Sequence, residues 1–186
     1  ISNVTNKIVP LIKEWQNRPL QSVYAVMFLD AIHFKVKQDG AIVNKAADLL
    51  EKEKDYIAEV TAKENGMLLG RCKGEVDMAV TAMRNLADLA KSFSSRTEME
   101  DETGWLRIEK KPMGVVAAII PWNAPIVRAM QKLVPMVVTG NTVVFKPSPF
   151  ASMGVTVALQ KVAQLFPPGV VNVVLGDADV GEAITS

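Results

Sequence analysis

The chain has 186 residues, enough for one domain or for one domain and part of a second. Hydrophobic residues make up 49% of it and charged residues 22%, as in globular proteins that bury a core. The 21 basic and 20 acidic side chains give a formal net charge of +1, so bulk charge indicates neither nucleic acid nor a membrane surface as partner. One cysteine, Cys72, excludes an internal disulfide framework and fits a reducing compartment. No signal segment or membrane-spanning run is visible, so we expect a cytoplasmic protein.

The first 40 residues predict a short helix followed by two strands. Val23 to Leu29 is apolar, and Ile32 to Lys37 alternates as a half-buried strand does, up to the turn at Gln38-Asp39-Gly40. Two strands alone are marginally stable in water.

Residues 45–111 predict two helices, a loop and a strand. Lys45 to Val60 carries one apolar face, and Glu64-Asn65-Gly66 ends it. Gly74 to Phe93 repeats apolar residues every three or four positions, which is typical of an amphipathic helix. Residues 94–104 are polar and acidic and predict a surface loop, and residues 105–111 predict an exposed strand.

From residue 112 onward, strands alternate with helices. We predict strands at 115–120, 142–145 and 170–175, and helices at 126–138, 152–165 and from about Val180. This alternation indicates an α/β fold with a parallel sheet and flanking helices. Ligands bind such sheets at the carboxyl ends of the strands, so Asn123 and Lys146 are expected in or beside a crevice.

The residues at these strand ends each allow two interpretations. The amide of Asn123 can stabilise a developing oxyanion, or it can cap the following helix. Lys146 can contact a phosphate as a point charge, or it can simply be solvated at a strand end. Residues 119–122 can line a crevice or belong to core and turn, and Gly176 and Gly181 permit either close approach to a ligand or ordinary turns.

Four ordered segments resemble the amino-terminal part of the NAD(P)-dependent aldehyde dehydrogenase superfamily. They are Pro112–Val116, Ile119–Asn123, Gly140–Ser148 and Pro167–Val174. The resemblance runs from about Ala47 to the end of the chain. It implies a helical segment and strand at 48–111 and an incomplete NAD(P)-binding domain at 112–186.

The resemblance also assigns roles to residues. It implies that Asn123 stabilises the oxyanion formed when a cysteine attacks an aldehyde, and that Lys146 binds the adenosine ribose hydroxyls of NAD or NADP. Many NAD-preferring relatives have a glutamate where Pro149 stands, so no preference between the cofactors is predicted. Members of the family form homo-oligomers. No metal ligand is expected, and the full set of expected cofactor-binding residues is Ile119, Ile120, Pro121, Trp122, Asn123, Lys146, Ser148, Pro149, Gly176 and Gly181.

The nucleophile and the general base of the family are expected outside these residues. Cys72 precedes the whole cofactor domain, whereas the family nucleophile follows it, so the position of Cys72 argues against catalysis even though Arg71 and Lys73 can lower a thiol pKa. The general-base carboxylate and the Phe-Thr-Gly-Ser segment of the family are expected beyond Ser186. We therefore expect no turnover from this chain as given.

Leu20 to Ala47 resembles a different family, the mutator-type bacterial transposases, through Phe28–His33 and Lys35–Lys37. This resemblance implies that Asp30 is the first of three carboxylates that bind two divalent metals. His33 is interpreted as a packed or hydrated strand residue. We expect residues 1–47 to be an unrelated segment outside the following core, with the boundary within Asn44–Ala47.

Three functions are therefore open. The chain can be part of an aldehyde dehydrogenase, a dinucleotide-binding remnant without turnover, or a transposase-derived fragment that binds DNA or transfers phosphodiesters. The near-zero net charge and the lone Asp30 disfavour the last.

Overall fold

The computed structural model describes residues 41–102 and 104–185. The helix and strands predicted within the first 40 residues, together with Asp30 and His33, lie outside this part. The elements in chain order are α3 (Ala41–Lys52), α4 (Lys54–Asn65), α5 (Leu69–Lys91), β1 (Arg96–Asp101), β2 (Gly104–Glu109), β3 (Val115–Ile120), α6 (Pro125–Val138), β4 (Thr142–Pro147), the 3₁₀ helix η1 (Pro149–Ala151), α7 (Ser152–Ala163), β5 (Val171–Val173) and α8 (Ala178–Thr185).

A parallel sheet in the order β3-β4-β5 forms the centre of the molecule, which confirms the predicted α/β fold. The β3–β4 register runs from Val115 opposite Thr142 to Ile120 opposite Pro147. On the other side of β4, Phe145 lies opposite Val173 of β5. All three strands therefore end at one edge of the sheet, the carboxyl edge.

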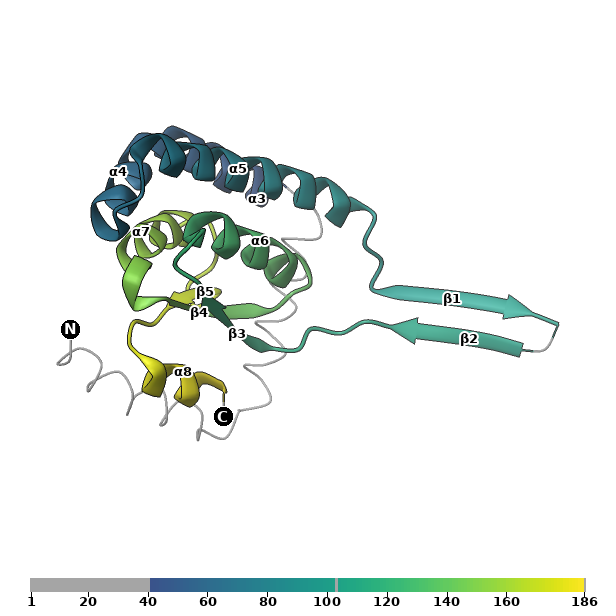
Figure 1. Ribbon diagram of the computed structural model, residues 1–186. Coiled ribbons are helices and arrows are strands. Elements are labelled where there is room, and N and C mark those ends of the chain that lie inside the picture. The colour runs from purple at the N-terminus through teal and green to yellow at the C-terminus, as the bar shows by residue number, and fades with distance from the viewer. Residues whose placement is uncertain (1–40, 103, 186) are drawn as a thin grey trace.

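Helices cover both faces of this sheet (Figure 1). Helices α6 and α7 lie on one face, and α8 lies on the other face and contacts β3. Helices α3, α4 and α5 form an outer layer over α6 and α7. The core runs through the outer helices, α6, α7 and the sheet, and it includes fully buried Met83, Ile126, Leu133, Phe145 and Leu159.

The helical layer differs from the prediction in two places. The helix predicted at 45–60 is two helices, α3 and α4, interrupted at Glu53, whose side chain pairs with Lys161 of α7 at 2.8 Å. Helix α5 begins at Leu69 instead of Gly74, so Gly70 and Gly74 both lie inside the helix. The predicted end of α4 is confirmed, since Gly66 adopts a φ of +75° there.

Residues 41–47 belong to this layer and to the core. Val43, Ala46 and Ala47 are buried where α3 packs against α5 and α7. The expectation that everything up to about Ala47 stays outside the core is therefore wrong for residues 41–47. The predicted boundary falls inside a continuous helix.

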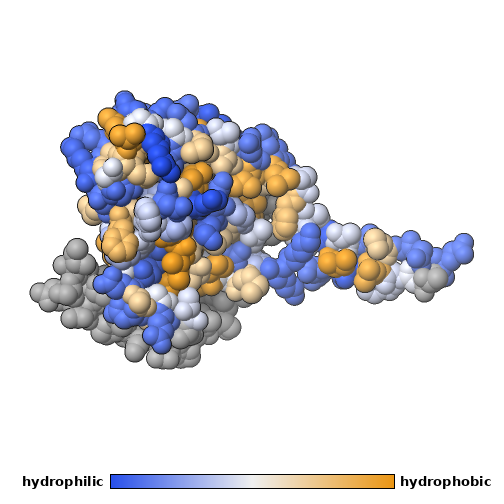
Figure 2. Space-filling view, viewed as in Figure 1, coloured by the Kyte–Doolittle hydropathy of each residue, from blue (hydrophilic) through white to orange (hydrophobic). Residues whose placement is uncertain are grey.

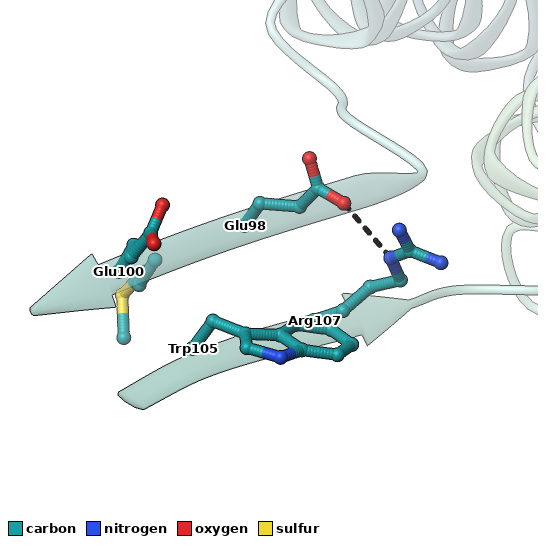
Figure 3. A pocket seen from close by; sticks show the side chains of 5 residues that line it. Glu98, Glu100, Trp105 and Arg107 are labelled. Carbon is teal, nitrogen blue, oxygen red and sulfur yellow. Dashed lines mark hydrogen bonds and ion pairs between the residues drawn. The ribbon is translucent and has the colours of Figure 1, made fainter. Parts of the chain in front are cut away.

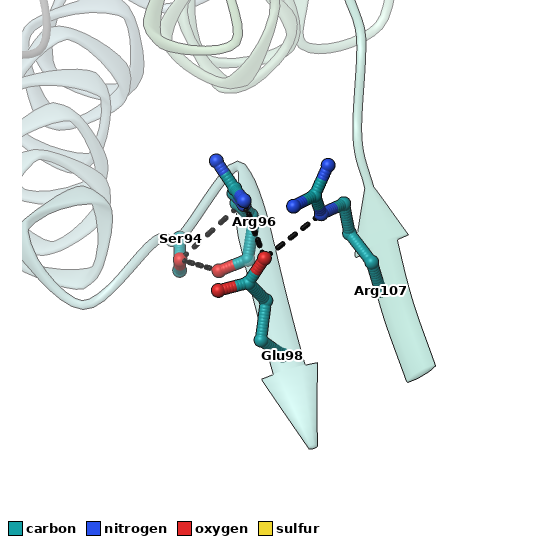
Figure 4. Close-up of polar contacts among 4 residues, drawn as sticks. All are labelled: Ser94, Arg96, Glu98 and Arg107. Atoms are coloured by element: carbon teal, nitrogen blue, oxygen red, sulfur yellow. Dashed lines mark hydrogen bonds and ion pairs between the residues drawn. The ribbon is translucent and has the colours of Figure 1, made fainter. Parts of the chain in front are cut away.

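A hairpin of β1 and β2 projects from the body (Figures 1 and 2). The loop predicted at 94–104 is wrong, because Arg96–Asp101 pairs antiparallel with residues 104–109, the region predicted as an exposed strand. Every residue of β1 and β2 is exposed. The sequence of β1 therefore has no apolar face whose pattern would have indicated a strand. The charged side chains of the hairpin pair with one another: Glu98 accepts from Arg96 and, at 2.8 Å, from Arg107 across the hairpin (Figure 4).

Among the described residues, no helix has both the length and the apolar character that crossing a membrane requires.

Candidate functional site

The carboxyl edge brings together the two segments that the sequence singled out. Ile119 of β3 lies opposite Lys146 of β4, one pair before the edge. The backbone N–H of Ser148 donates to the carbonyl of Ile120 at 2.9 Å, which joins the chain leaving β4 to the end of β3. The turn at 121–124 and the loop at 148–149 therefore start side by side.

Asn123 lies in the turn between β3 and α6. Its side chain is exposed, and no hydrogen bond to another described residue engages it. Helix α6 begins at Pro125 with Ala124 at the N-cap position and no capping side chain. The alternative interpretation of Asn123 as the helix cap is therefore wrong. Its amide is free to donate to a ligand, and neighbouring Trp122 is 56% exposed beside it.

Lys146 is buried at the same edge. It is 5% exposed, so the side chain as a whole does not extend into solvent as the interpretation of a solvated strand-end lysine expects. Within the described part of the chain, no hydrogen bond or ion pair engages its ammonium group. A β-carbon placed at Gly181 of α8 would lie 3.6 Å from Lys146 Cε, so the lysine stem runs against that glycine. The buried part of the side chain is its stem, because Asn65 Nδ2, and not the Lys146 nitrogen, is the described buried side-chain atom that lacks a hydrogen-bond partner. The ammonium group therefore reaches solvent, and its three donors are open to an anionic or hydroxyl-rich ligand.

The other predicted residues divide between structural and exposed positions. The Ser148 hydroxyl accepts from the N–H of Phe150 at 3.3 Å and so caps η1, which Pro149 begins. Ile120 is buried in the core, whereas Ile119 is half exposed and Pro121 is exposed. Gly176 follows β5 with a φ of +153°, a backbone conformation that favours glycine.

Two glutamates, which the sequence reasoning missed, hold the helices that follow the carboxyl edge. Glu75 of α5 accepts from the N–H groups of Ile126 and Val127 at the start of α6, at 2.6 and 3.2 Å. Glu64 of α4 accepts from Ser152, Met153 and Gly154 at the start of α7. Glu75 lies on the buried face of α5. Charged residues are rarely buried, so a glutamate within the apolar pattern of this helix was the one sequence feature that indicated a special role.

Ionisation of Glu75 is affected by its surroundings. Burial raises the pKa of the Glu75 carboxyl, and the two backbone N–H donors and the charge of Arg71 oppose that rise only in part.

Cys72 lies in the first turn of α5, and not between the helix predicted to end at 64–66 and the helix predicted to begin at Gly74. It is 1% exposed. Burial raises the pKa of its thiol, the charge of Glu75 raises it further, and Arg71 offsets only part of the effect. A protonated, inaccessible thiol is a poor nucleophile. Among residues 41–102 and 104–185, no group of three His, Cys, Asp or Glu side chains could hold a metal ion.

A surface hollow lies elsewhere, on the projecting hairpin (Figure 3). Glu98, Met99, Glu100, Trp105 and Arg107 line it, and the Arg107 guanidinium stands 5.4 Å from the centre of the Trp105 ring. None of the predicted site residues contributes to it.

The folded topology and the motifs at the carboxyl edge agree with a family match. Residues 29–186 match the aldehyde dehydrogenase family, and the chain belongs to that family. Residues 1–49 match the family named Transposase, Mutator family, so the two matches overlap at 29–49.

Individual relatives show how much of a family member is present. The chain is 34% identical to an aldehyde dehydrogenase of Davidiella tassiana over 148 residues, covering 79% of this chain and 30% of that protein. It is also 34% identical to an acetaldehyde dehydrogenase of Pseudomonas aeruginosa over 154 residues, covering 81% and 30%. The chain thus spans about 30% of the length of these relatives.

Solved structures agree with the fold. An aldehyde dehydrogenase from Brucella melitensis biovar abortus 2308 superposes with a TM-score of 0.80 at 27% identity, covering 96% of this chain and 36% of that one. PnpE in complex with nicotinamide adenine dinucleotide superposes with a TM-score of 0.74 at 27% identity, covering 86% and 34%.

Proposed function

We propose that this chain supplies the cofactor wall and the oxyanion donor of an NAD(P)-dependent aldehyde dehydrogenase, an oxidoreductase that acts on an aldehyde. One observation carries the proposal most directly: the stem of Lys146 is buried at the carboxyl edge, and its ammonium group has no partner among the described residues. A lysine whose stem is fixed in this way can present its three donors to a ligand with little side-chain freedom left to lose.

The ligand we propose is NAD or NADP. Lys146 would donate to its adenosine ribose hydroxyls, with Gly181 leaving space beside the lysine stem. Ile119 and residues 121–123 would form the wall on one side, and the loop at 148–149 and Gly176 the other. When bound, the nicotinamide ring accepts a hydride from the substrate. Pro149 places no carboxylate near the ribose, so a 2′-phosphate meets no repulsion from that position.

Asn123 is proposed as the group that stabilises the oxyanion. A neutral amide can donate to a developing negative charge, and this amide has no competing bond among the described residues. The attacking thiolate must come from outside these 186 residues, because Cys72 is their only cysteine and is buried. We therefore propose that the 186 residues by themselves do not oxidise aldehydes.

The remaining parts of the proposal rest on the family. They are an aldehyde as substrate of the whole enzyme, assembly into a homo-oligomer, a cytoplasmic location, and the division into a segment at 48–111 and a cofactor-binding part at 112–186. Light scattering of the purified chain tests the assembly. A role in DNA transactions rests on the match of residues 1–49 alone, and the near-zero net charge counts against it.

Calorimetric titration with NAD and with NADP tests the cofactor proposal. We expect weak binding of both with similar affinity. Lys146→Met is expected to weaken both by about tenfold, since a hydrogen bond to a charged group contributes about 1.5–3 kcal/mol. Lys132→Met is the matched control, because Lys132 is an exposed lysine on α6. A strong preference for NAD, or equal binding by the Lys146 and Lys132 variants, would contradict the proposal.

A further inference from the structure

Helix α6 begins without any cap of its own. Ala124 occupies the N-cap position, and its side chain cannot accept a hydrogen bond. Pro125 has no N–H, so Ile126 and Val127 carry the first donors that need partners. Both residues are buried, and water does not satisfy them cheaply there.

Glu75 supplies the missing cap from another helix. A single oxygen, Oε1, accepts both N–H groups, and the residue is 3% exposed. Glu75 is 51 residues earlier in the chain than Ile126, so this bond links α5 directly to the start of α6. Keeping a carboxylate buried is unfavourable, and a well-packed apolar residue would serve packing alone at less cost.

The start of α6 in turn determines where Asn123 lies. Asn123 precedes Pro125 by two residues, and the carbonyl of intervening Ala124 is already bonded to the N–H of Arg128 at 3.2 Å. On the other side, Ile120 is held by β4. The turn therefore has little freedom as long as the helix start is fixed.

We propose that Glu75 is a positioning residue of the site: by capping α6 from α5, it holds the turn that carries Trp122 and Asn123. The functional meaning of this position rests on the proposed role of Asn123. The positioning itself does not involve the dinucleotide.

Glu64 provides a comparison within the same chain. It caps α7 through both oxygens, Oε1 accepting from Ser152 and Met153 and Oε2 from Gly154 at 3.1 Å. Glu75→Gln keeps an acceptor oxygen for both of its donors, whereas Glu64→Gln places an amide NH₂ against one N–H. Glutamine should therefore rescue the first cap and only partly the second.

Fluorescence of Trp122 reports on the turn. In a parent chain carrying Trp15→Phe and Trp105→Phe, Trp122 is the only indole. Glu75→Ala is expected to lower the steady-state anisotropy of Trp122, because two unpaired N–H groups loosen the helix start. Glu75→Gln is expected to restore it. Glu64→Ala, which removes a cap of the other helix, is expected to leave it unchanged.

Three results would overturn the proposal: no effect of Glu75→Ala on Trp122, an equal effect of Glu64→Ala, or no rescue by glutamine. Amide hydrogen exchange of the unsubstituted chain gives a second test that does not depend on a variant folding. The N–H groups of Ile126 and Val127 are expected to be as protected as those in the middle of α6, and exchange at the rate of a frayed end would contradict the cap.

Titration of the same variants with NAD separates this proposal from the proposed function. Glu75→Ala is expected to weaken binding by about fivefold, the share of one hydrogen bond, and Glu75→Gln to restore it. If the parent does not bind NAD while Trp122 responds to Glu75→Ala, the proposed function fails and the positioning stands. If the parent binds NAD and Trp122 does not respond, the positioning fails alone.

Discussion

Two asparagines lie at opposite edges of the parallel sheet, and their surroundings differ. Asn141, just before β4, is 6% exposed. Its Oδ1 accepts from Met113 and Gly114 at 2.6 and 3.1 Å, and its Nδ2 donates to the Thr139 hydroxyl at 2.8 Å and to the Met136 carbonyl at 3.3 Å. Asn123, just after β3, is exposed and makes no such bond among the described residues.

This difference separates a structural edge from a candidate binding edge. Polar groups inside proteins are nearly always hydrogen-bonded. The Asn141 side chain follows this rule, because its oxygen and its nitrogen are both bonded to residues at the amino edge of the sheet. At the carboxyl edge, the amide of Asn123 and the ammonium group of Lys146 are left without partners in the described chain. The same residue type thus stabilises the fold at one edge and remains free at the other.

The largest expected effect tests this comparison directly. Asn141→Ala leaves the N–H groups of Met113 and Gly114 without their acceptor and should lower the free energy of unfolding by about 2–4 kcal/mol. Asn123→Ala should change it by less than about 0.5 kcal/mol, as for other exposed positions. Urea denaturation measures both, and equal losses would remove the distinction between the two edges.

Helix α7, which follows the carboxyl edge, is tightly packed against α4. A second variant tests whether the packing next to this edge is as close as that contact indicates. A β-carbon at Gly154 of α7 would stand 2.2 Å from the Thr61 hydroxyl oxygen of α4. Gly154→Ala is therefore expected to cost about 1–3 kcal/mol.

Gly70→Ala in α5 is the matched control. It meets nothing within 4 Å and should stabilise the chain by about 0.5–1 kcal/mol. Adding Thr61→Ala to Gly154→Ala should recover part of the loss. Thermal or urea unfolding of these three variants and of the unsubstituted chain gives the result, and a neutral Gly154→Ala would show that α4 and α7 are loosely packed.

A smaller effect concerns pH. Because burial raises the pKa of Glu75 in the folded chain above the ordinary value of 4.5, its contribution to stability is present below about pH 4.5 and is lost as pH rises through the folded pKa. Glu75→Gln cannot ionise and keeps the cap. The free energy of unfolding of this variant relative to the unsubstituted chain should therefore increase with pH above 4.5. A difference that is flat between pH 4 and pH 7, or that falls, would contradict the assigned cause.

The sequence allowed the elements with strong apolar patterns to be predicted, and the motif at 140–148 directed attention to Lys146. Other features follow from contacts between residues far apart in the chain. Nothing near α6 indicated that Glu75 would cap it, and the polar segment of β1 forms a strand only because residues 104–109 lie beside it. Glu53, where the predicted helix is interrupted, likewise pairs with a residue far along the chain, Lys161 of α7.

The central claim is that Lys146 at the carboxyl edge serves a dinucleotide. Its most direct test is urea unfolding of the unsubstituted chain and of Lys146→Met, each with and without NAD. Without NAD, the methionine variant should be at least as stable, because methionine fills the space of the buried lysine stem and no partner of the ammonium group among the described residues is lost. At a NAD concentration ten times the dissociation constant of the unsubstituted chain, that chain should gain about 1.4 kcal/mol and the variant much less. A variant that is less stable without NAD and gains equally with it would show that Lys146 serves the fold and not the cofactor.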